Sequence, residues 1–177
     1  VTSTDSIIIS ASISVGVVGI YSNYTLISST LKSLYGQVFA AFTSSFGNLA
    51  VSEDIERAYY IYDKAIYLAF TLTCCMATGF VSVINPFIEL CFGKEYVLGQ
   101  LNTILIAISF YFMCMNVPAV SVQNALGLHN KDMWAMVAQG IFNLSISLIL
   151  VYYIGLSGVI IGTIASTVLF PVISKDY

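Results

Sequence analysis

Hydrophobic positions follow one another along this chain in long runs that no charged residue interrupts. Five charge-free runs of 20 to 42 residues cover positions 6–31, 33–52, 65–88, 96–128 and 133–174. A helix needs roughly 20 apolar residues to cross the hydrocarbon layer of a membrane. The runs lack the alternating polarity, in segments of about ten residues, that is typical of membrane β-strands. The pattern therefore predicts an all-α, polytopic transmembrane helix bundle.

Glycine, proline and charged residues divide these runs into helices. A partial span is expected near residues 3–13, followed by a full span over about 17–50. The next begins at a cap at 52–54 and runs to about 83, and another covers about 97–127. The last run, 133–174, should hold two spans that separate near 153–158. Asn85-Pro86 should end or kink the third helix, Pro118 should kink the fourth, and residues 128–132 should form a turn. We expect about five full spans and one partial span.

The composition excludes several classes of protein. With 58% hydrophobic and 8% charged residues, the chain has too little charge for a soluble surface. Its net charge of -3 comes with no cluster of Lys or Arg, so no nucleic-acid partner is expected. The chain begins at Val1 without the basic segment of a signal peptide, which leads us to expect a missing N-terminal portion.

The basic residues predict an orientation in the membrane. If connections alternate sides, Arg57, Lys64, Lys131 and Lys175 share one side and Lys94 lies on the other. Lys and Arg are enriched in cytoplasmic loops. The first side is therefore predicted to be cytoplasmic.

Asp5 and Lys32 are the first candidates for a functional role. Ionisable groups inside spans are costly and usually face a bundle interior or a wet cavity. Two ordinary alternatives stay open: Asp5 could cap its short helix beside Thr4, and Lys32 could extend its amine towards the membrane interface. On the same long helix, Asn23 and Gln37 are close to four turns apart and predict a polar face that lines a substrate cavity or bonds to other helices.

Two further features predict gating and helix contacts. Arg57 and Lys64, at the start of the third helix, are candidates for a cytoplasmic gate, with a solvated helix end as the simpler interpretation. Gly158 and Gly162 form a GxxxG pattern, which allows another helix to approach closely.

The chain lacks the residue patterns of an enzyme or a metalloprotein. It contains neither GxSxG, HExxH nor a phosphate-binding glycine loop, and its one histidine is His129. The four cysteines have no CxxC spacing and are interpreted as small apolar residues. We expect no enzymatic activity, no metal and no cofactor.

Four segments together resemble the C-terminal half of bacterial polysaccharide flippases. These transporters of O-antigen and capsule repeat units belong to the multidrug/oligosaccharidyl-lipid/polysaccharide exporter superfamily. The segments are TDSIIIS at 4–10, VGIYSNY at 18–24, NPFIEL at 85–90 with GKEY at 93–96, and GLSGVIIGT at 155–163. Their order and spacing match that family from its seventh helix onward, over nearly the whole chain.

The resemblance implies that residues 1–177 form one half of a two-lobed transporter whose N-terminal half is its partner. Such a protein moves an undecaprenyl-diphosphate-linked oligosaccharide across the bacterial cytoplasmic (inner) membrane by alternating access. Lys32 fits the family's polar and basic cavity by residue type, and Asp5 lies in a matching motif. The alternatives are a multidrug or small-cation exporter of the same superfamily, which would depend on intramembrane acids, and a structural membrane subunit.

Overall fold

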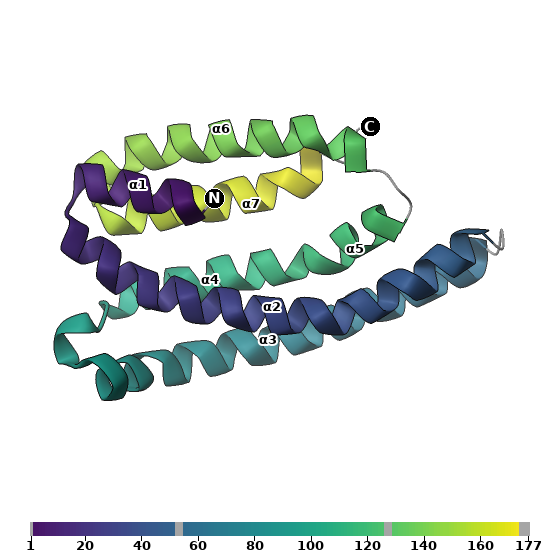
Figure 1. Cartoon of the computed structure of the whole chain (residues 1–177), viewed down its shortest axis with the longest axis horizontal. Coiled ribbons are helices and arrows are strands. Elements are labelled where there is room, and N and C mark those ends of the chain that lie inside the picture. Colours follow the sequence, from purple (N-terminus) through teal and green to yellow (C-terminus); the bar gives the residue numbers. More distant parts are fainter. Residues whose placement is uncertain (1, 52–54, 126–128, 174–177) are drawn as a thin grey trace.

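The computed structural model (Figure 1) describes residues 2–51, 55–125 and 129–173, with side chains described except at 2–3, 42–51, 55, 58, 129–136 and 170–173. Its elements are α1 Thr2–Ser12, α2 Val15–Val51, α3 Ile55–Phe92, the 3₁₀ turn η1 Lys94–Tyr96, α4 Gln100–Met115, α5 Val117–Ala125, α6 His129–Ile154 and α7 Leu156–Ile173. No strand occurs in these ranges. The predicted all-α class is confirmed.

Buried stripes on the long helices decide how they pack. On α2, Tyr21, Tyr24, Tyr35 and Phe39 are buried at spacings of three, eleven and four residues, which keeps them on one side of the helix. Tyr21 and Tyr24 belong to a core shared by α1, α2, α3, α4, α6 and α7, whereas Tyr35 and Phe39 belong to a second core with α3 and α4. A single helix, α2, therefore joins both cores.

The helices form two groups with α4 between them (Figure 1). Helices α1, α6 and α7 pack together, α2 packs against α3 and α5, and α4 contacts α2, α3 and α7. Helix α1 also contacts α2. Contacts between the groups thus run through α4 and through the α1–α2 pair.

Three helical segments are long and apolar enough to cross a membrane: Tyr59–Phe92, Gln100–Ala125 and Val137–Ile154. Leu156–Leu169 is a shorter apolar helix. Helix α2 has 37 residues but many Ser, Thr and Tyr side chains, besides Lys32, and these lower its hydropathy. The described part of the chain is that of a membrane protein, and the fuller count of about five spans and one partial span stays a prediction.

The predicted breaks agree with the structure in most places. The α6–α7 connection is at Gly155, whose φ of 59° is a left-handed conformation that glycine adopts without strain. Helix α4 ends before Asn116 and α5 begins at Val117, next to Pro118. Pro86 does not end α3, which continues to Phe92, because a membrane helix tolerates proline where neighbouring groups satisfy the freed backbone. The capping residues 52–54 lie outside the described ranges.

The turn predicted for residues 128–132 is wrong from His129 onward, since α6 already begins there. Polar residues with Asp132 among them are compatible with the first turns of a helix, whose N-terminal dipole favours an acid. Leu128 lies outside the described residues.

The C-terminal part of α2 and the N-terminal part of α3 extend together past the other helices (Figure 1). At about 1.5 Å per residue, the 37 residues of α2 give a length of roughly 55 Å, well above the roughly 30 Å of a hydrocarbon layer. Arg57 and Lys64 lie at the start of α3, and Lys94 follows its other end. These basic residues are thus at opposite ends of the bundle, and Lys175 lies outside the described residues.

Candidate functional site

Asp5 is a buried acid inside the group formed by α1, α6 and α7. It shares one face of α1 with Ile8 and Ile9, because positions i, i+3 and i+4 lie on the same side of a helix. All three residues are at most 3% exposed, and Asp5 itself is at 0%. The face of α1 that enters the core thus carries a carboxyl group among isoleucines.

Three polar residues are joined to the Asp5 carboxyl group by a chain of hydrogen bonds that runs through Thr163. With Asp5 they form what we call the Asp5 cluster: Asn143 of α6, and Thr163 and Ser166 of α7. The Thr163 hydroxyl donates to Asp5 Oδ2 at 2.9 Å. Asn143 Nδ2 donates to Thr163 Oγ1 at 3.2 Å and to Ser166 Oγ at 3.3 Å. All members are at most 3% exposed. Asn143 and Thr163 lie near the middle of their helices, so the cluster is deep within the bundle.

Two oxygens of this cluster lack a donor. Within the described residues, Asp5 Oδ1 and Asn143 Oδ1 are buried and have no hydrogen-bond partner. We call them the acceptor pair. An unsatisfied buried polar group costs about 1–3 kcal/mol, and more when it is charged. Within the described residues, the hydrogen bonding of the cluster is therefore incomplete.

Tyr21 links this cluster to α2. Its side chain is 4% exposed and lies close enough to Asp5 for the two side chains to interact. Tyr21 also belongs to the apolar core that contains Ile8, Ile9, Val159 and Ile160. The carboxyl group thus has polar neighbours from α2 and α7 within an apolar surrounding.

The chemistry of the cluster suits a small cation. Carboxylate, amide and hydroxyl oxygens are hard ligands for cations. A proton or Na⁺ bound at Asp5 Oδ1 would take the place of its missing hydrogen-bond donor. In the described part of the chain, no group of three or more His, Cys, Asp or Glu residues could hold a metal ion. The donor set therefore matches an alkali cation or a proton better than a transition metal.

Lys32 lies elsewhere, in the middle of α2. It is half-buried and close enough to the buried Cys114 of α4 to interact with its thiol. No acidic partner of Lys32 occurs among the described residues, whereas Lys94 pairs with Glu89 at 3.5 Å. The structure does not bring Lys32 and Asp5 into one cluster.

The remaining predicted residues occupy different surroundings. Asn23 is half-buried on α2, whereas Gln37 is exposed. Arg57 and Lys64 are exposed in the first turns of α3, with Lys64 Nζ 5.3 Å from the centroid of the Tyr60 ring. These four residues do not contact the Asp5 cluster in any described interaction.

Gly158 and Gly162 lie where α7 touches α6. A Cβ atom on Gly158 would overlap the carbonyl oxygen of Leu150, and one on Gly162 would overlap the Ser147 hydroxyl. Both glycines are buried. Close approach of the two helices therefore requires hydrogen at these positions. It also brings Asn143 of α6 within reach of Thr163 and Ser166.

A second polar cluster, which we call the Asn85 cluster, ties α2, α3 and α4. Asn85 Oδ1 accepts from Tyr24 at 2.7 Å and from Thr103 Oγ1 at 3.0 Å. The backbone amide of Leu98 donates to the Tyr24 hydroxyl at 3.0 Å. Tyr24 is 0% exposed and Thr103 is 1% exposed. This cluster lies near the η1 end of the bundle and encloses the connection into α4.

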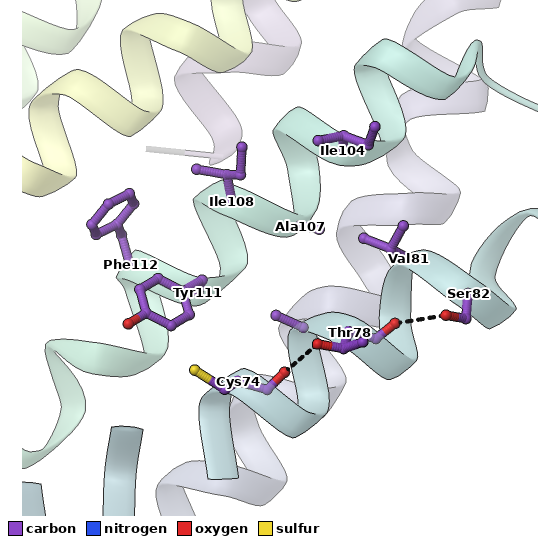
Figure 2. A pocket seen from close by; sticks show the side chains of 10 residues that line it. Cys74, Thr78, Val81, Ser82, Ile104, Ala107, Ile108, Tyr111 and Phe112 are labelled. Carbon is purple, nitrogen blue, oxygen red and sulfur yellow. Dashed lines mark hydrogen bonds between the residues drawn. The ribbon is translucent and has the colours of Figure 1, made fainter. Parts of the chain in front are cut away.

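An apolar groove of about 580 Å³ runs between α3 and α4, as Figure 2 shows. Thr78 and Ser82 contribute hydroxyls to its wall, but these donate to the carbonyls of Cys74 and Thr78 at 2.8 and 2.9 Å. The rest of the lining is mainly Val, Ile, Ala and aromatic side chains. Such a surface suits apolar chains of the surrounding lipid.

Sequence reasoning missed Asn143, Thr163 and Ser166. Asn143 is a signal of its own, because it is an amide near the middle of the first of the two spans expected within the longest charge-free run, 133–174. Thr163 and Ser166 are three residues apart and share a helix face. The pairing itself had no local signal, since Asp5 and Thr163 are 158 residues apart.

No family model, no curated protein and no solved structure matches the chain.

Proposed function

We propose that this chain forms one half of a membrane transporter in which the Asp5 cluster binds the coupling cation. The proposed substrate is an undecaprenyl-diphosphate-linked oligosaccharide, an O-antigen or capsule repeat unit, moved across the bacterial cytoplasmic membrane by alternating access. In this proposal α1 is the partial span, and α2, α3, α4 with α5, α6 and α7 are the five full spans. The observation that carries the proposal is the acceptor pair, buried where α1, α6 and α7 meet.

The acceptor pair supports cation coupling for a physical reason. A buried carboxylate that receives a hydrogen bond on only one of its oxygens is costly, so the packed arrangement of the three helices favours the cation-bound state. A ligand shifts a conformational equilibrium by its difference in affinity for the two states. A cation that completes the cluster only when α1, α6 and α7 are packed together would therefore stabilise that arrangement.

Lys32 supports the choice of an anionic substrate. Its amine lies in the middle of a long helix without an acidic partner among the described residues. An intramembrane cation of this kind is costly unless it meets an anion or water. A diphosphate head group would supply that anion, while the lipid tail stays in the bilayer. The N-terminal half of the transporter would complete the cavity.

The Asp5 cluster also favours a second candidate, a drug or small-cation exporter of the same superfamily. Such a protein depends on an intramembrane acid, and Asp5 provides one. The two candidates differ in the substrate that Lys32 would meet: an anionic head group in the first and a cationic molecule, repelled by the lysine, in the second.

Complementation tests the substrate. The full-length protein is expressed in a bacterial strain that lacks its repeat-unit flippase, and surface polysaccharide is scored on a gel. We expect restored polymer with the parent sequence, with Asp63→Asn and with Lys94→Ala, whose side chains are exposed, and loss with Asp5→Asn and Lys32→Ala at equal membrane levels. Failure of the correctly inserted parent across several sugar backgrounds would exclude the flippase and favour the exporter.

The coupling cation is tested separately on the purified protein. Binding of ²²Na⁺ is measured at fixed pH. Proton uptake after a small downward step in pH is followed separately with a dye. Saturable ²²Na⁺ binding that Asp5→Asn abolishes identifies a Na⁺ site. Proton uptake that depends on Asp5 without ²²Na⁺ binding identifies a proton site, and absence of both rejects cation coupling.

A further inference from the structure

We infer that Tyr21 and Tyr24 of α2 couple the occupancy of the Asp5 cluster to the packing of the Asn85 cluster. The inference deepens the proposed function and rests on cation binding at Asp5. In this inference, cation binding among α1, α6 and α7 acts through α2. It changes how tightly α2, α3 and α4 pack at the end of the bundle near η1.

Tyr21 and Tyr24 lie close together along α2. They are three residues apart, so they share a face of α2 and are separated by a rise of about 4.5 Å. Tyr21 interacts with Asp5, and Tyr24 donates to Asn85. The two polar clusters are thus joined by less than one turn of a single helix.

An apolar core surrounds the two tyrosines. Tyr21 and Tyr24 are 4% and 0% exposed and belong to the same buried cluster as Ile9, Ile84 and Leu98. Close-packed interiors transmit small displacements because their side chains have no free volume in which to relax. A shift of Tyr21 relative to Asp5 must therefore move Tyr24 or deform this core.

The hydrogen bond from Leu98 to Tyr24 would respond to such a shift. The Leu98 amide precedes α4 and donates to the Tyr24 hydroxyl at 3.0 Å. Because Leu98 is 9% exposed, the loss of this bond would leave a buried amide without its acceptor. The rate of hydrogen exchange at the Leu98 amide therefore reports on the position of the Tyr24 hydroxyl.

Hydrogen exchange at Leu98, resolved to the single amide by mass spectrometry, tests the coupling. The full-length protein is compared in Na⁺-free buffer and with NaCl at ten times the Kd found by ²²Na⁺ binding. Full coupling would slow exchange by about elevenfold, since a ligand protects a coupled segment by the factor 1 + [L]/Kd. We expect at least about a threefold slowing at Leu98.

Two variants isolate the role of the tyrosines. Tyr21→Phe removes the interaction with Asp5 but keeps the Leu98–Tyr24 bond, so Leu98 should stay protected and lose its response to Na⁺ at ten times the variant's own Kd. Tyr35→Phe is the matched control, because it also removes a buried hydroxyl of α2, one that bonds to Thr73 and Ala69 of α3. Its Leu98 response should equal that of the parent.

Asp5→Asn makes the test independent of which cation binds. Neutralising Asp5 imitates the occupied site, so Leu98 exchange in this variant should be slower than in the Na⁺-free parent, and adding Tyr21→Phe should remove the difference. Equal Leu98 exchange in the parent and in Asp5→Asn overturns the coupling, even where ²²Na⁺ binding shows that the cation site is real. Loss of ²²Na⁺ and proton binding together with a clear Asp5→Asn effect instead rejects the cation site and retains the mechanical link.

Discussion

The two polar clusters of this bundle differ in how far their hydrogen bonds are satisfied. In the Asn85 cluster, Asn85 Oδ1 accepts two bonds, and the Tyr24 hydroxyl both donates and accepts. In the Asp5 cluster, the acceptor pair is left without donors from the described residues, although Asp5 and Asn143 are more deeply buried than Asn85.

The difference distinguishes a cluster that holds helices together from one that we propose binds a cation. A satisfied cluster fixes the packing of its helices and gains nothing from a ligand. An unsatisfied cluster carries the free-energy cost of unpaired buried groups, which a bound ligand can remove. The stability of the protein should then depend on the concentration of that ligand. Substitutions in the two clusters should therefore affect different measurements.

The largest effect is expected for Asp5→Asn on cation binding. Loss of the one carboxylate in the cluster should weaken Na⁺ binding by about 3 kcal/mol, or roughly a hundredfold. In Na⁺-free buffer the variant should melt at the same temperature as the parent or higher, because it no longer buries a charge. Thermal unfolding with and without NaCl measures both.

The exposed acid Asp63 provides the control, and Asp63→Asn should keep the Na⁺-dependent rise in melting temperature. If Asp5→Asn instead destabilised the protein while its Na⁺ response was retained, Asp5 would be a structural residue like those of the Asn85 cluster.

The second largest effect is expected for Gly162→Val. The added side chain would overlap Ser147 and push α7 from α6, which should lower the free energy of unfolding by about 2 kcal/mol. It should also weaken Na⁺ binding, since Thr163 and Asn143 move apart, while leaving Leu98 exchange in Na⁺-free buffer close to the parent's. Denaturation in mild detergent reports the stability.

Gly140→Val is the matched control on α6, because a Cβ atom there meets no described atom within 4 Å. Equal stability losses in the two variants would mean that the α6–α7 contact is looser than the structure has it.

A smaller effect is expected for Tyr24→Phe. The variant leaves the Leu98 amide without an acceptor and should lower stability by about 1 kcal/mol, near the upper range of single bonds between membrane helices. Tyr35→Phe should cost less, because the bonds of Tyr35 are longer, at 3.2 and 3.5 Å. A larger loss for Tyr35→Phe than for Tyr24→Phe in the same unfolding assay would contradict the ranking of the clusters.

The fold was largely predictable because its breaks have local causes. Gly155 supplies a left-handed residue, and Pro118 lacks a backbone donor, so both act within one turn of their own position. Pro86 shows the limit of this reasoning. The preceding residue, Asn85, accepts hydrogen bonds from Tyr24 and Thr103 on other helices. These contacts depend on tertiary packing, which no local sequence pattern reveals.

Of the candidate site, the sequence alone singled out only Asp5. An acid in an apolar segment draws attention by itself, and Asp5 is buried at the junction of three helices. Its partners could not be found in the same way, because Thr and Ser occur throughout membrane helices and their pairing depends on contacts 158 residues apart. Gln37 illustrates the converse, since helical spacing placed it on a polar face that the structure leaves exposed.

The smallest effect on stability is expected for Lys32→Ala, and it sharpens the comparison by adding a residue outside both clusters. Lys32 is half-buried and has no ion pair in the described ranges, so its loss should change the free energy of unfolding by no more than about 0.5 kcal/mol. Na⁺ binding should also be unchanged, because no described interaction joins Lys32 to the Asp5 cluster.

If Lys32 meets an anionic head group, the same variant should lose binding of a polyprenyl diphosphate measured by microscale thermophoresis. Lys94→Ala, on an exposed residue, should keep that binding. A Lys32→Ala protein that is stable, binds Na⁺ and still binds the diphosphate would exclude Lys32 from the substrate site. Substrate recognition would then require a cation from the N-terminal half of the transporter, while the cation site at Asp5 would stand unaffected.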